Sequence, residues 1–80
     1  MKNTINITVK LFAQYREGRF KVDNRTYPPE TTADDVVKDL GIDESKLAVG
    51  VFMVNGRHVK KDHKLQDGDT LSIFPKVGGG

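Results

Sequence analysis

The end of the chain carries the residues best suited to chemistry, because residues 77–80 read Val-Gly-Gly-Gly. Glycine has no functional side chain, so the reactive group here is the terminal carboxylate of Gly80. Gly78 and Gly79 would form a slender approach to it, since they lack a Cβ and accept any backbone conformation that a narrow channel imposes. Four extended residues span about 13 Å, enough to enter another protein's active site. The plain alternative is an unordered glycine-rich terminus without function.

Other residue clusters predict structure better than catalysis. His58 and His63 lack a third ligand such as cysteine, which argues against a zinc site. Asp34 and Asp35 fit the first turn of a helix, and residues 67–69 (Asp-Gly-Asp) fit a turn better than a calcium loop. No phosphate-binding loop, nucleophile elbow or metalloprotease motif occurs. We therefore expect no catalytic residue and no bound metal or cofactor in this protein, which is predicted not to be an enzyme.

Length and composition allow one small domain. The chain has 80 residues, 36% of them hydrophobic, and no cysteine. The absence of cysteine excludes a disulfide framework, a thiolate metal site and a cysteine nucleophile, and it is compatible with a reducing cytosol. No run approaches the roughly 20 apolar residues that cross a bilayer. Residues 1–10 alternate polar and apolar side chains, unlike a signal segment, so a cytoplasmic protein without membrane contact is expected.

Charge is divided unevenly along the chain. The formal net charge is only +2, too small to indicate nucleic-acid binding by itself. The charged residues in segment 30–46 are mostly acidic, whereas those in segment 57–64 are mostly basic. No aromatic side chains interleave with these basic residues to stack on bases, which argues against RNA binding. A solvated charged face or a surface that attracts an acidic partner both remain open.

The elements follow from short-range patterns. Ile5, Ile7, Val9 and Leu11 alternate with polar residues, which predicts a strand. A weaker alternating stretch runs from Phe20 to Tyr27, and a helix over residues 33–40 begins after the N-cap Thr32 and ends at Gly41. Further strands are expected at 49–54 and 70–75, with a hairpin turn at residues 55–56 (Asn-Gly). This order predicts an α+β domain with one helix packed across a mixed sheet.

Two strands carry apolar residues on both faces. In residues 49–54, apolar side chains occur at both odd and even positions and so on both faces of the strand. This pattern indicates a strand that is buried on both faces or that lies at a partner surface. In the last strand, Leu71 and Ile73 share the face expected to enter the core. Phe74 then lies on the outer face, close to the C-terminus.

Four segments together resemble one family. Residues 10–17 (KLFAQYRE), 54–56 (VNG), 65–69 (LQDGD) and 74–80 (FPKVGGG) look like the small sulfur carriers of the ubiquitin-like β-grasp superfamily, the molybdopterin synthase small subunit and the thiamin-pathway sulfur carrier. The resemblance spans almost the whole chain in the right order, although only the tail is specific by itself. It implies a β-grasp domain over residues 1–76 and a flexible tail over residues 77–80.

The resemblance implies a mechanism in which partners do the chemistry. An adenylating enzyme similar to ubiquitin E1 would use ATP to activate Gly80, and a persulfide donor or sulfurtransferase would convert it to a thiocarboxylate. A sulfur-accepting synthase would then take the sulfur. Phe74, Pro75 and Val77 would offer an apolar surface on which these partners dock.

The same resemblance leaves the pathway open. The segment FAQYRE and the Phe-Pro pair look like the molybdopterin branch, whereas Val-Gly-Gly-Gly looks like the thiamin branch, and Lys76 stands where the molybdopterin branch usually has a second proline. Pterin cofactor, thiamin, another sulfurated metabolite and tRNA thiolation are all compatible with it. The alternative function is a ubiquitin-like modifier that is conjugated to target lysines through Gly80, and an RNA-binding module that uses residues 57–64 is a third possibility.

Overall fold

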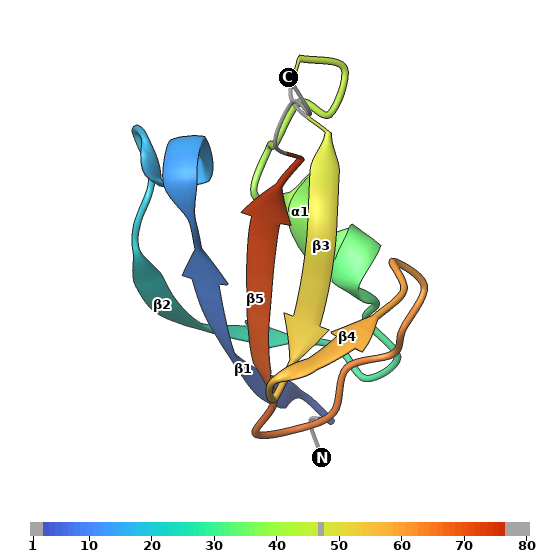
Figure 1. Cartoon of the computed structure of the whole chain (residues 1–80). Coiled ribbons are helices and arrows are strands. Elements are labelled where there is room, and N and C mark those ends of the chain that lie inside the picture. The colour runs from blue at the N-terminus through green and yellow to red at the C-terminus, as the bar shows by residue number, and fades with distance from the viewer. Residues whose placement is uncertain (1–2, 47, 77–80) are drawn as a thin grey trace.

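A single five-stranded sheet organises the chain in a computed structural model that describes residues 3–46 and 48–76 (Figure 1). The strands are β1 (Ile5–Leu11), β2 (Val22–Tyr27), β3 (Val49–Val54), β4 (Arg57–Val59) and β5 (Thr70–Pro75). Their order in the sheet is β2-β1-β5-β3-β4, and β1 and β5 run parallel at its centre while the other pairs are antiparallel. The predicted mixed sheet is thus confirmed.

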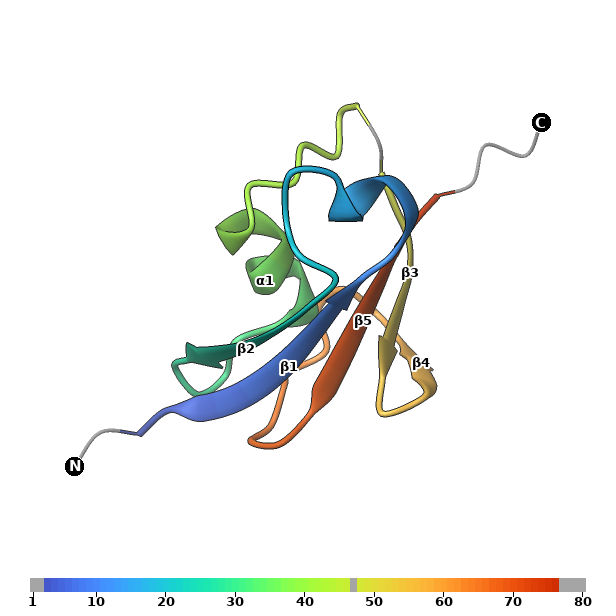
Figure 2. The same ribbon diagram turned by 90° about the vertical axis from the view of Figure 1, so that its left-hand side faces the viewer.

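One helix covers one face of this sheet. The helix α1 (Ala33–Asp39) buries Ala33, Val36 and Val37 against the strands, and Figure 2 shows it on one side of the sheet. The core-facing strand residues are fully or almost fully buried: Ile7, Val9, Leu11, Leu71 and Ile73 are each at most 1% exposed. The apolar residues of the alternating pattern in β1 therefore form its buried face. The prediction that Leu71 and Ile73 enter the core is also confirmed.

The start of α1 is fixed by local chemistry. The Thr32 hydroxyl accepts a hydrogen bond from the Asp35 backbone N–H at 3.1 Å, and the Asp35 carboxylate accepts one from the Thr32 N–H at 3.0 Å. This reciprocal pair satisfies two backbone donors that the helix itself leaves unpaired. The Thr32 backbone hydrogen bond is also the main reason why the pKa of Asp35 lies below its usual range. Asp34 and Asp35 are thus structural residues, as predicted.

Two parts of the chain differ from the sequence-based expectation. The second strand begins at Val22, not at Phe20, and its inward side chains are Asp23, Arg25 and Tyr27, while Val22 is 52% exposed. The reason is that β2 is an edge strand whose inner face is closed by Arg25, which lies over the Phe20 ring and pairs with Asp39 at 3.3 Å. A 3-10 helix, η1 (Ala13–Arg16), was not predicted.

The predicted turns take the expected form. Asn55 and Gly56 have φ values of 52° and 84°, as the tight β3–β4 hairpin requires. The turn at Asp67 to Asp69 is tied to β1, since the Asn6 N–H donates to the Asp67 carboxylate at 2.7 Å. The Asp69 carboxylate accepts from the Gln66 backbone N–H at 2.8 Å, so each aspartate helps to hold the turn through a hydrogen bond. Within the described ranges, no helix is long and apolar enough to span a bilayer.

Candidate functional site

The end of β5 fixes the point from which the predicted tail departs. Val77, Gly78, Gly79 and Gly80 lie outside the described residues, so their predicted roles stay predictions. The last described residue, Lys76, is exposed, and its backbone N–H donates to the Ala48 carbonyl at 2.8 Å. The main chain is therefore held against the β3 side of the sheet up to residue 76.

A glycine allows this close approach. A Cβ on Gly50 would lie 2.7 Å from the Lys76 Cα and 3.0 Å from the Pro75 carbonyl oxygen, closer than side chains normally come to backbone. The pairing of β3 with β5 also shifts between Val49 and Val51, which is the local irregularity that makes room for it. Gly50 thus permits the end of β5 to remain paired with β3.

The outer face of the sheet carries an apolar patch at this end. Val51 lies opposite Phe74, and Met53 lies opposite Ser72, so these side chains project away from α1. The Phe74 ring stacks on Phe12, with ring centroids 4.2 Å apart and planes inclined by 13°. Each of the apolar side chains is half-buried. We call Phe12, Val51, Met53 and Phe74 the outer apolar patch.

Phe12 is held in place by η1. The Arg16 guanidinium lies 5.3 Å from the centroid of the Phe12 ring, and its Nε donates to the Leu11 carbonyl at 2.7 Å. These contacts fix the segment that follows β1, and the ring is positioned to cover one side of Phe74. No local sequence pattern predicts this partner for Phe74.

The patch borders a shallow depression beside Lys76. Its volume is about 380 Å³, and it is lined by Val51, Met53 and Phe74, by His58 of β4, and by backbone near Gly50 and Pro75. Pro75 itself is buried, so Phe74 offers more of the accessible surface than Pro75 does. The predicted placement of Phe74 on the outer face agrees with the structure. Val51 and Met53 were not named individually from the sequence, although the two-sided apolar pattern of residues 49–54 was the signal for them.

At this face the described residues present the outer apolar patch together with His58. No cluster of three His, Cys, Asp or Glu side chains that could hold a metal ion occurs among residues 3–46 and 48–76. The perturbed pKa values belong to structural contacts elsewhere. Burial raises the pKa of Tyr27, whose hydroxyl also donates to Asp39, and hydrogen bonds from Ser45 lower the pKa of Asp43. The site can therefore present a surface and a chain end.

Comparison with known proteins gives a consistent family. The ThiS family model matches residues 9–80. A Haloferax volcanii protein solved in solution is 30% identical with a TM-score of 0.80, and the match covers 100% of this chain and 91% of that one. A Pyrococcus furiosus protein described as subunit 1 of molybdopterin-converting factor is 26% identical with a TM-score of 0.72, over 91% of this chain and 99% of that one.

The fold also matches that of a protein modifier. Small archaeal modifier protein 1 of Haloferax volcanii has a TM-score of 0.73 at 22% identity, covering 91% of this chain and 99% of that one, which shows a shared fold. A comparison with curated protein sequences gave no significant match. Since the family model spans nearly the whole chain and the fold agrees with that of the solved relatives, the chain belongs to the ThiS family of small ubiquitin-like sulfur carriers.

Proposed function

We propose that this protein carries sulfur as a thiocarboxylate on Gly80. An adenylating enzyme transfers AMP from ATP to the Gly80 carboxylate, releasing pyrophosphate, because a free carboxylate is a poor electrophile. The terminal sulfur of a persulfide, held by a sulfurtransferase or by the activating enzyme, then attacks the acyl carbon and AMP leaves. A second thiol cleaves the resulting S–S bond, and the sulfur stays on Gly80 for transfer to a synthase.

The observation that carries this proposal is the position of the outer apolar patch. Phe74 lies on β5, two residues before Lys76, so a partner bound to the patch lies close to the point where residues 77–80 begin. Aromatic and methionine side chains are enriched at the centres of protein interfaces. The half-buried side chains of the outer apolar patch therefore support docking of a partner at this face.

The final acceptor depends on the partner. Biosynthesis of molybdopterin or tungstopterin cofactor and biosynthesis of thiamin are the pathways that the family membership suggests, and in each the sulfur acceptor would be a precursor of the product. The Pyrococcus furiosus relative bears the name of a molybdopterin-converting subunit. In the pterin case the protein would act as the small subunit of a synthase. In either case, no step requires a metal or cofactor bound by this chain.

Intact mass spectrometry of the protein from its own cells tests the proposal. We expect a fraction of the molecules in which one terminal oxygen is replaced by sulfur. A variant lacking Gly80 should keep the wild-type melting temperature, since the described core ends before it, and should form no adenylate with the activating enzyme. Continued adenylation of this variant would refute the assignment of Gly80.

Conjugation to other proteins is the competing outcome. Trypsin cleaves after Lys76, so a conjugated modifier would leave Val-Gly-Gly-Gly on the lysines of its targets. If such branched peptides were found and no thiocarboxylate were present in protein from the same cells, the protein would be a modifier and not a sulfur carrier.

A further inference from the structure

The basic segment, residues 57–64, is left without a role by the proposed function. Arg57, Lys60 and Lys61 are exposed, and no hydrogen bond or ion pair involving their side chains occurs within the described part of the chain. Only Lys64 is paired, with Glu30 at 3.0 Å. Clustered like charges repel one another, so this arrangement lowers stability unless a partner of opposite charge compensates it.

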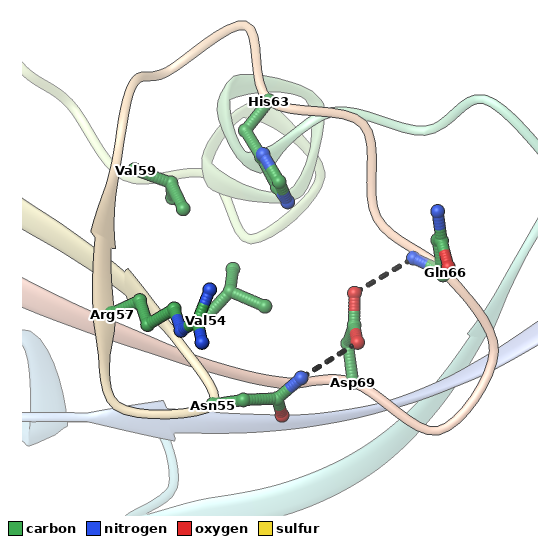
Figure 3. Close-up of a pocket in the computed structure, with 7 residues that line it drawn as sticks. All are labelled: Val54, Asn55, Arg57, Val59, His63, Gln66 and Asp69. Carbon is green, nitrogen blue, oxygen red and sulfur yellow. Dashed lines mark hydrogen bonds between the residues drawn. The ribbon is translucent and has the colours of Figure 1, made fainter.

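A hollow of about 510 Å³ lies between this segment and the turn before β5. Figure 3 shows Arg57 of β4 and His63 of the following loop extending toward the same space. Its apolar lining comes from Val54 and Val59. Asp69 lies across the hollow from Arg57, and Asn55 lies beside Arg57 with its side chain directed toward Asp69 (Figure 3).

The walls of the hollow are held by internal hydrogen bonds. One Asp69 oxygen accepts from the Asn55 side-chain amide at 2.9 Å, and the other accepts from the Gln66 backbone N–H at 2.8 Å. On the other wall, the His63 carbonyl accepts from the Ala33 N–H of α1 at 3.1 Å. The hollow is therefore a fixed feature of the fold, and a ligand need not order the loop in order to bind.

The free groups in the hollow suit a carboxylate. A guanidinium binds a carboxylate through two parallel hydrogen bonds, and the neighbouring lysines attract an acidic chain. Asp69 already uses both oxygens internally, but its negative charge disfavours a doubly charged phosphate more than a singly charged carboxylate. Among the residues that line the hollow, His63 carries the single ring on which a nucleic-acid base could stack, and no Phe, Tyr or Trp extends this ring into a stacking surface.

We propose that this hollow binds a glutamate or aspartate side chain from an acidic segment of a partner protein, with Arg57 as its main contact and Lys60 and Lys61 attracting the flanking acids. The site lies at the opposite end of the sheet from Lys76. Thr70, whose N–H donates to the Asn55 side chain, begins β5, and Lys76 directly follows it, so the two are six residues or about 20 Å apart. In Figure 1 the β3–β4 hairpin and the end of β5 lie at opposite ends of the sheet. A partner bound at the hollow would leave the chain end free for another enzyme.

Titration of the full, isotope-labelled chain with a short glutamate-rich peptide at low salt tests the site by NMR. We expect shifts at the Arg57 side chain, at His63 and at the Asn55 amide, and a loss of binding as salt rises. Arg57→Gln should raise the Kd about fivefold. Lys21→Gln is the matched control, because Lys21 is also exposed and cationic but precedes β2 at the far edge of the sheet.

The controls separate the possible ligands. A peptide with glutamine in place of glutamate should produce no shifts. If Lys21→Gln weakens binding as much as Arg57→Gln does, the attraction is general charge and the site does not exist. If inorganic phosphate or a single-stranded RNA oligonucleotide moves the same resonances at lower concentration than the peptide, the carboxylate assignment is wrong. None of these measurements involves Gly80. A negative result would therefore refute the carboxylate site without affecting the proposal that Gly80 carries sulfur.

Discussion

Replacing Phe74 by alanine tests whether the outer apolar patch is a docking surface. The ring is half-buried and stacks on Phe12, so its removal also costs stability. An aromatic pair contributes about 0.5–1.5 kcal/mol beyond its buried area, and truncating a fully buried Phe costs about 3–5 kcal/mol. Because the Phe74 ring keeps part of its surface in water, we expect a loss of about 1–3 kcal/mol in the free energy of unfolding.

Phe74→Ala should also weaken the binding of the activating enzyme. An aromatic residue at the centre of an interface typically contributes about 2 kcal/mol or more on truncation. This corresponds to a roughly 30-fold rise in the KM of the activating enzyme for this protein. The assay is ATP–pyrophosphate exchange by the activating enzyme, with this protein as the varied substrate. It is run at a temperature at which a urea unfolding curve shows that Phe74→Ala is folded in the absence of urea.

The neighbouring residue on the opposite face is the matched control. Ile73 is 0% exposed and points into the core, so Ile73→Val should cost about 0.5–1.5 kcal/mol of stability and leave the KM unchanged. The interpretation would be refuted if Phe74→Ala left the KM unchanged. It would also be refuted if Ile73→Val raised the KM as much as Phe74→Ala did, since the effect would then follow stability and not the surface.

Two further predictions concern the support of the chain end and the pH dependence of stability. Gly50→Ala places a Cβ 2.7 Å from the Lys76 Cα, so we expect a loss of about 1–3 kcal/mol and faster hydrogen exchange at the Lys76 amide; an unchanged exchange rate would contradict this. Because hydrogen bonds from Thr32 lower the pKa of Asp35 below its ordinary value of 3.8, the Asp35 carboxylate stabilises the fold above that pH and loses this effect as the pH falls through the lowered pKa. The difference in urea stability between the wild type and Asp35→Asn should therefore be present at neutral pH and vanish in acid, and a difference that persisted in acid would exclude the capping contact as its source.

Much of the fold was predictable because its signals are short-range. The alternation from Ile5 to Leu11, the Thr32 cap and the Asn55-Gly56 turn each depend on residues within a few positions of one another. The same patterns put Phe74 on the outer face, whereas the prediction that chemistry takes place at Gly80 concerns residues outside the described part of the chain. These features follow from backbone geometry and from the burial of one face of each element.

The edge strand shows where such patterns fail. Residues from Phe20 onward were read as one alternating strand, but the inner face of β2 is formed by Asp23, Arg25 and Tyr27. A polar inner face is tolerated because Arg25 lies over an aromatic ring and pairs with Asp39 on α1. Which residues contact Arg25 depends on how α1 packs on the sheet, and this packing cannot be predicted from a local sequence pattern.

The sequence alone determined the helix, the strands β1, β3 and β5, and the buried faces of β1 and β5, because these depend on side-chain periodicity. It also determined the β3–β4 turn, through the special conformations of asparagine and glycine. Only the tertiary structure decided that β5 lies between β1, its parallel neighbour, and β3, its antiparallel neighbour. The first pairing brings Phe12 onto Phe74, and the second brings Gly50 against Lys76. It also brought Arg57 and His63 to one hollow. Contacts between residues far apart in the chain arise from the packing of whole elements, and the stability of that packing is shared among all of them.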